Sequence, residues 1–158
     1  MKFAARYLAI IVLLIAVSAK AYSQSIHLAD MVKLVRTTNP GASAYLKGKG
    51  FTPLPSEAVN GQLMNRFSKK SAKGAELIIK TQSLTTDRKA HNIVDYNITP
   101  NTFAATIAKE LLAAKFKIAT NIHDKTKDNK LYDNGTYTVS VYTFTDKRLP
   151  AAIEIRVK

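Results

Sequence analysis

The chain has no cysteine, and this absence excludes several classes of protein. Small secreted scaffolds that depend on disulfides are excluded, as are thiol chemistry and metal sites built from thiolates. A lipid-modified cysteine behind an export signal is excluded for the same reason. The fold must therefore be stabilised by packing alone, which a chain of this length can supply.

Apolar runs long enough to cross a membrane are not seen either. The uninterrupted apolar run Tyr7–Val17 has eleven residues, whereas a spanning helix needs about 20. Lys2 and Arg6 precede this run, and small residues follow it up to Ser23. A basic head, a short apolar stretch and small residues, in that order, are typical of a secretory signal peptide.

Residues 1–23 are therefore predicted to be a cleaved signal peptide, and residues 24–158 to form a single α+β domain. Cleavage after Ser23 is favoured, and cleavage after Ala21 stays open, because both sites have the small-x-small form. The protein is expected to be secreted or periplasmic, without a lipid anchor or a stable membrane anchor after cleavage.

Basic residues outnumber acidic ones, 24 to 11. Lys2, Arg6 and Lys20 lie in the predicted leader, so 21 remain against 11 and the mature chain carries about +10. Such a charge attracts polyanions. The basic residues are scattered as pairs and triplets, however. Lysine is also far more frequent than arginine, the residue whose guanidinium can contact a phosphate through two nitrogens at once. A solvated basic surface with weak polyanion affinity is the favoured interpretation.

The first half of the mature chain predicts two short helices and three strands. Apolar residues recur at spacings of three and four over 28–35, which indicates a helix. Asn39-Pro40-Gly41 interrupts that pattern, and a second helix is predicted over 42–46. A loop with two prolines follows, up to Gly61. Alternation then predicts strands over 63–69, 75–82 and 91–99.

The second half predicts another helix followed by three strands. Thr99 is a suitable N-cap, Pro100 suits the first helical position, and an amphipathic stripe extends to Lys115. Residues 123–130 are charged and predicted to be turn-like, and Asp133-Asn134-Gly135 is a hairpin signal. Alternation predicts strands over 116–122, 136–145 and 151–157.

Together these elements predict an α+β fold, a two-layer sandwich in which two helical segments pack on one face of an antiparallel sheet of about six strands. Residues 45–51 and 112–116 end their helices in similar ways, so the halves also allow an internal pseudo-repeat of one helix plus three strands. The arrangement resembles the tandem helix-and-sheet architecture of secreted β-lactamase-inhibitor-like proteins. That resemblance concerns architecture and implies no function.

Recognisable catalytic or metal-binding motifs are lacking. His27, His91 and His123 are not spaced as metal ligands, and no Gly-x-Ser-x-Gly occurs. The glutamates are isolated in sequence, so no acid–base pair is indicated. We predict no catalytic residue, no metal ligand and no cofactor, and a non-enzymatic role is favoured.

The strand predicted over 136–145 carries the strongest binding signal. One of its faces is apolar, yet the opposite face presents Tyr142 and Phe144 beside Thr138 and Ser140. If helices cover one side of the sheet only, these rings project from the other side, where aromatics can anchor a partner. The leading hypothesis is an exported binding module that uses the open sheet face to contact a protein, peptide or glycan.

Two alternatives from other classes stay open. One is a small exported hydrolase whose site is assembled from His91, Asp95 and Glu110, residues that are separated in sequence. The other is a basic protein that binds polyanions through its charge. A pocket that collects two of the three hydrolase residues would favour the first, and lysines gathered on one side would favour the second.

Overall fold

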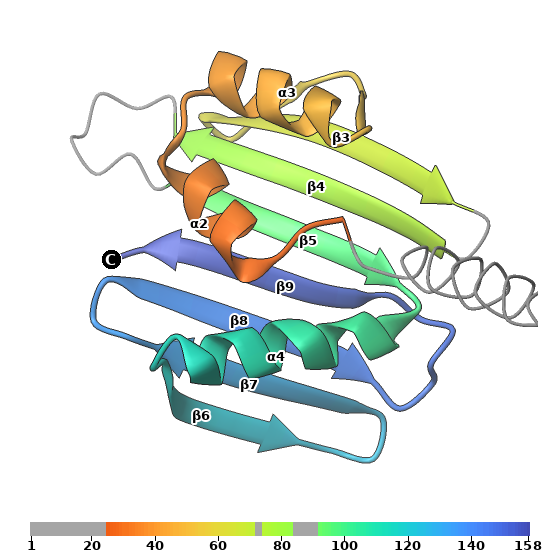
Figure 1. Ribbon diagram of the computed structural model, residues 1–158, viewed down its shortest axis with the longest axis vertical. Helices are drawn as coiled ribbons and strands as arrows, with labels where there is room; N and C mark the ends of the chain where they lie inside the picture. The colour runs from red at the N-terminus through yellow and green to blue at the C-terminus, as the bar shows by residue number, and fades with distance from the viewer. Residues whose placement is uncertain (1–24, 72–73, 84–91) are drawn as a thin grey trace, which may run out of the picture.

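The computed structural model describes residues 25–71, 74–83 and 92–158, so the predicted signal peptide lies outside the described residues. Within them, helices lie on one face of one antiparallel sheet, and the predicted two-layer α+β architecture is confirmed (Figure 1). The helical elements are α2 (Leu28–Arg36), α3 (Asn39–Gly48), the 3-10 turn η2 (Asn101–Phe103) and α4 (Ala104–Ala113). The strands are β1 (Thr52–Pro53), β2 (Glu57–Val59), β3 (Gln62–Ser71), β4 (Gly74–Ser83), β5 (Ile93–Thr99), β6 (Lys117–His123), β7 (Lys127–Asp133), β8 (Tyr137–Phe144) and β9 (Ala151–Val157).

The strand order is β1-β3-β4-β5-β9-β8-β7-β6, and β2 also pairs with β3. In the first half of the chain, helices α2 and α3 are followed by the short strands β1 and β2 and then by the adjacent strands β3, β4 and β5. In the second half, α4 is followed by the outer strand β6 and then by the adjacent strands β7, β8 and β9. The last strands of the halves, β5 and β9, pair with each other in the middle of the sheet. The topology therefore contains the predicted pseudo-repeat, with β1 and β2 as additional strands in the first half and β7 as the additional strand in the second.

The part of the sheet that the structure describes has nine strands, more than the six predicted. The short strands β1 and β2 lie in the segment predicted as a proline-containing loop. β7 overlaps the segment predicted to be turn-like, because its sequence KDNKLYD has no apolar alternation. It is a strand because β6 and β8 pair with it on both sides and satisfy its backbone groups.

The helix boundaries also differ from the predicted ones. The predicted break between the first two helices falls at Thr37 and Thr38, whereas Pro40 lies in the first turn of α3, where its missing N–H costs nothing. The helix predicted to begin at Pro100, with Thr99 as its N-cap, begins as the 3-10 turn η2, and α4 then runs to Ala113 rather than Lys115. The predicted stripe over 28–35 is confirmed as α2.

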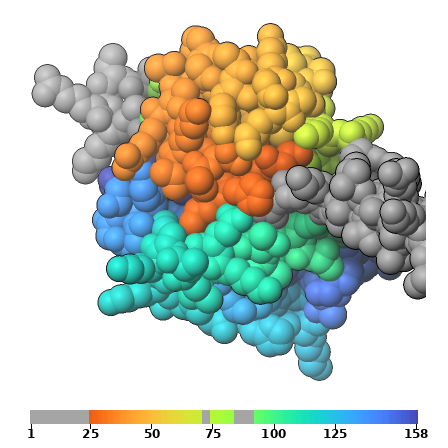
Figure 2. All heavy atoms as spheres, viewed as in Figure 1, coloured from red at the N-terminus to blue at the C-terminus, as the bar shows by residue number. Residues whose placement is uncertain are grey.

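The core lies between the helices and the sheet. From α2, Met31, Leu34 and Val35 are at most 1% exposed, and from α4, Ile107 and Leu111 are fully buried. Figure 2 shows the helices as the outer layer of this face. The inward side chains of the central strands complete the core: Ile78, Val94, Tyr96, Ile98, Val139, Val141, Ala151, Ile153 and Ile155.

α3 and α4 end in the same backbone motif, which supports the pseudo-repeat. The Phe51 N–H donates to the Leu46 carbonyl and the Phe116 N–H to the Leu111 carbonyl, both at 3.0 Å. The residue before each phenylalanine has a left-handed backbone, with φ of 84° at Gly50 and 63° at Lys115. These are Schellman caps, each followed by a buried aromatic ring.

This comparison predicts opposite effects of two substitutions. Lys115→Gly should raise the free energy of unfolding by about 0.5–1 kcal/mol, because a left-handed backbone costs a residue with a side chain more than it costs glycine. Gly50→Ala should lower it by about 1 kcal/mol, since an added Cβ would stay 3.7 Å from its nearest neighbours and only the backbone strain counts. Urea denaturation measures both, and a destabilised Lys115→Gly variant would contradict this interpretation.

Candidate functional site

The side of the sheet opposite the helices carries the two predicted binding residues. Val139 and Val141 of β8 are buried beneath the helices, so the alternating residues Tyr142 and Phe144 lie on the open face. Their ring centroids are 5.1 Å apart and their planes form an angle of 75°, an edge-to-face pair. The pair lies at the end of β8, where Tyr142 is opposite Ala152 of β9 and Phe144 is opposite Lys127 of β7.

Both rings are half-buried rather than fully exposed. They shield each other, and the Lys127 ammonium lies 6.0 Å from the centroid of the Tyr142 ring. The cross-strand neighbour of Tyr142 on β9 is Ala152, a small side chain beside the ring. A partner can therefore contact the remaining exposed part of the Tyr142 ring without displacing a large residue.

Hydrogen-bonding groups lie on the same face along the strands, on one side of this aromatic pair. The Ser140 hydroxyl donates to the Asn129 Oδ1 at 2.8 Å, a bond between β8 and β7. On β9 the Arg156 Nε donates to the Glu154 carboxylate at 2.5 Å. The open face thus combines aromatic surface with polar groups, the composition from which aromatic-anchored interfaces are built.

The open face also holds a carboxylate pair that the sequence did not predict. Asp95 on β5 lies directly opposite Glu154 on β9. Burial raises the pKa of Asp95 to about 6, the negative charge of Glu154 adds to the shift, and the nearby Arg156 opposes it. Asp95 can therefore hold a proton under mildly acidic conditions, unlike an ordinary aspartate.

Two of the three residues of the hydrolase hypothesis, Asp95 and Glu110, are not brought together. Asp95 is on the open face, whereas Glu110 of α4 belongs to the helical layer and lies 2.6 Å from the His27 Nδ1. The Glu110 carboxylate also accepts the Leu28 N–H at 2.7 Å, so that it ties α4 to the start of α2. His91 lies outside the described residues. The sheet separates Asp95 from Glu110.

The basic residues do not act as one free surface, because many are paired with carboxylates. Seven lysine or arginine side chains form ion pairs within the described segments. These pairs occur on both sides of the sheet, from Lys49 with Asp30 in the helical layer to Arg156 with Glu154 on the open face. This distribution gives no specific support to the polyanion hypothesis.

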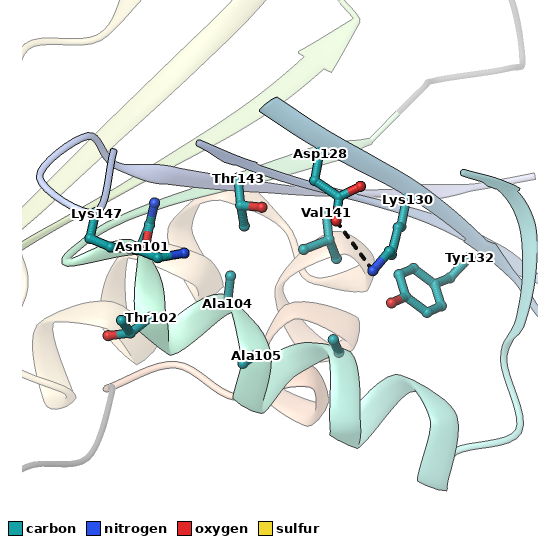
Figure 3. Close-up of a pocket in the computed structure, with 11 residues that line it drawn as sticks. Asn101, Thr102, Ala104, Ala105, Asp128, Lys130, Tyr132, Val141, Thr143 and Lys147 are labelled. Atoms are coloured by element: carbon teal, nitrogen blue, oxygen red, sulfur yellow. Dashed lines mark ion pairs between the residues drawn. The ribbon is translucent and has the colours of Figure 1, made fainter. Parts of the chain in front are cut away.

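A cleft that sequence patterns did not indicate lies on the helical side, between α4 and strands β7 and β8 (Figure 3). Its volume is about 270 Å³, and it includes Lys130, Tyr132 and Lys147. Lys130 lies in the segment predicted to be turn-like, and Lys147 lies in the loop after β8. Neither segment has the periodic pattern of apolar residues from which a helix or strand can be predicted. Only the pairing of β7 beneath α4 brings them together.

None of the described helices is long and apolar enough to cross a membrane. The described residues also contain no cluster of three or more histidine, aspartate or glutamate side chains that could hold a metal ion. Comparison with models of protein families, with curated proteins and with solved structures finds no significant match. Functional inference must therefore come from the surfaces of the molecule itself.

The raised pKa of Asp95 predicts a specific dependence of stability on pH. Between about pH 4 and pH 6 the folded state keeps a proton that the unfolded state has already lost. The Asp95 contribution therefore falls as the pH rises through this window, by roughly 2–3 kcal/mol in total. Asp95→Asn should abolish this loss and raise the free energy of unfolding at pH 8 by a similar amount.

Urea denaturation across this pH range, with wild type and variant compared at each pH, tests the prediction. Glu154→Gln is the matched variant: removing the like charge should lower the pKa of Asp95 and weaken the same slope by a smaller amount. A constant difference in stability between wild type and Asp95→Asn at every pH would contradict the assignment.

Proposed function

We propose that the protein is an exported, non-enzymatic binding module whose contact surface is the open sheet face. The observation that carries the proposal is one-sided coverage: all helices of the described residues pack on one side of the sheet (Figure 1), and the Tyr142–Phe144 pair lies on the other. An aromatic pair with polar neighbours is a suitable anchor for a protein, a peptide or a glycan.

The central strands also place apolar side chains on the open face. Leu77 and Ile79 on β4 and Ile93 on β5 lie on the side opposite the buried residues Ile78 and Val94. All three side chains are half-buried by the side chains around them, and none of the described helices lies on this side of the sheet. Covering this surface with a partner would remove further apolar area from water, which favours association.

The expected export determines where the partner is met. A signal peptide over residues 1–23 would deliver the module out of the cytoplasm, so the ligand is a secreted, periplasmic or cell-surface molecule. A chain without cysteine is suited to such a compartment, because it folds correctly whatever the redox state.

The positions of the carboxylates support binding over hydrolysis. A hydrolase site that used both Asp95 and Glu110 would need them on one side of the sheet, and the sheet lies between them. Glu110 is already occupied by His27 and the Leu28 N–H. Its role is to join two helices.

The proposal predicts loss of binding when the aromatic anchor is truncated. Tyr142→Ala and Phe144→Ala should each weaken capture of the partner from an extracytoplasmic fraction by roughly thirtyfold, because truncation of an anchoring aromatic costs about 2 kcal/mol or more. Affinity capture on the immobilised residues 24–158, with quantitative mass spectrometry of the bound material, measures this loss.

Leu112→Ala is the matched control, because Leu112 is an apolar residue on α4 that is 54% exposed on the helical side. It should leave capture unchanged. Circular dichroism checks that the aromatic variants stay folded, since the lost ring pair costs only about 0.5–1.5 kcal/mol. Undiminished capture by both folded aromatic variants would reject the open face as the contact surface.

A further inference from the structure

The cleft between α4 and strands β7 and β8 has the chemistry of a ligand site separate from the open face. β8 and β9 present valine and isoleucine to the helices, whereas β7 presents Asp128, Lys130 and Tyr132. Figure 3 shows Lys130 and Tyr132 extending from β7 toward α4. Polar groups therefore line a space between helix and sheet that apolar side chains would ordinarily fill.

Small residues on α4 keep this space open. Ala104, Ala105 and Ala108 are the residues of α4 that line the cleft, and Figure 3 shows α4 lying opposite β7 across this space. The resulting volume of about 270 Å³ lies just below the usual range for sites of drug-sized ligands, which begins at roughly 300 Å³. The cleft therefore suits a small molecule rather than a peptide.

The charges in the cleft favour an anion. The Lys130 ammonium lies 3.2 Å from the Asp128 carboxylate and is thus largely compensated. Lys147 enters from the loop after β8 (Figure 3), and none of the ion pairs found in the described residues includes it. Lys147 is exposed, so one cation without an ion pair lies at the solvent-exposed edge of the cleft, where it can make a charge-assisted contact with an oxyanion.

Hydrogen-bonding capacity in the cleft is incomplete. The Asn101 amide nitrogen donates to the carbonyl oxygens of Phe144 and Asp146, at 2.8 and 3.3 Å, and this fixes the orientation of the amide. Asn101 is 2% exposed, yet its Oδ1 has no partner among the described atoms. The Asp128 Oδ1 has no hydrogen bond either, but it lies 3.8 Å from the His123 Nδ1 on β6. The Asn101 Oδ1 is therefore the acceptor that a ligand hydroxyl, or a water it orders, would satisfy.

We propose that this cleft binds a small hydroxylated organic anion, of the kind represented by sugar acids and sugar phosphates. Its carboxylate or phosphate would lie at Lys147, and its hydroxyls would meet Lys130, Tyr132 and the acceptor oxygen of Asn101. The site is on the opposite side of the sheet from Tyr142 and Phe144, so it does not depend on the proposed partner surface.

Two-dimensional amide NMR of residues 24–158 tests the proposal with gluconate and glycerol 3-phosphate as probes, at ionic strength matched with chloride. The expected result is a saturable shift of the Thr102, Thr143 and Lys147 amides with at least one probe. Neutral glycerol should leave these amides unshifted. Response to gluconate alone or to glycerol 3-phosphate alone would identify a carboxylate or a phosphate as the anionic group.

Variants separate the cleft from general attraction of anions. Lys147→Met should weaken binding by roughly tenfold or more, the effect of losing one charge-assisted contact. Ala105→Phe should abolish binding by filling the cleft from an exposed helix position. Lys125→Met is the matched control, because Lys125 is an exposed lysine of the β6–β7 turn, which does not line the cleft, and it should bind as wild type does.

Any of three results would overturn the proposal. The first is no shift of the cleft amides with either probe up to millimolar concentrations. The second is equal binding by wild type and Lys147→Met, which remains decisive if Ala105→Phe fails to fold. The third is a non-saturating response spread over surface lysines, including Lys125, which would show an adventitious ion only. Each of these results leaves the assignment of the open face unaffected.

Discussion

The packing of α2, α3 and α4 onto one face of the sheet is the interaction on which the other features depend. It requires a continuous apolar surface on that side of the central strands, which Ile78, Tyr96, Val139 and Ile153 supply. Because side chains alternate along a strand, fixing one face fixes the other. Asp95 and Tyr142 are on the open face because Val94, Tyr96 and Val141 beside them in sequence are buried in the core. Phe144 shares that face because it lies two residues after Tyr142 in the same strand.

The same packing explains the cleft. α4 lies over β8 and β9 with buried Ile107 and Leu111, and toward β7 it presents alanines. The sheet continues beyond the area that the helix can fill. Asp128 and Lys130 of β7 are tolerated there because they do not have to pack in the apolar core. Together with the alanines of α4, they line the cleft.

Periodicity predicted the parts of the fold in which one face is strongly apolar. The stripe of α2 and the alternation in β5, β8 and β9 are of this kind, and their inward residues are those expected. β7 could not be predicted, because Asp128 and Lys130 occupy its inward positions and its strand character comes from its neighbours in the sheet. The break between α2 and α3 was predicted at Pro40, yet Pro40 lies in the first turn of α3. The local sequence cannot separate these two arrangements, because proline is compatible both with the end of one helix and with the first turn of the next.

The candidate surfaces were predictable to different degrees. Tyr142 and Phe144 are two apart in one strand, so their shared face follows from the alternation alone. Asp95 beside Glu154, and Lys130 and Lys147 around one cleft, depend on the strand order and on contacts between distant segments. The strand order cannot be derived from a single sequence, so these two sites can be recognised only in the three-dimensional structure.

Site-specific photo-crosslinking in the producing cell tests the central claim most directly, with a benzophenone side chain placed at position 142 on the open face or at position 112 on α4. If the uncovered side of the sheet is the contact surface, position 142 should give a discrete crosslinked product and position 112 should give none. A product at position 112 together with none at position 142 would contradict the account.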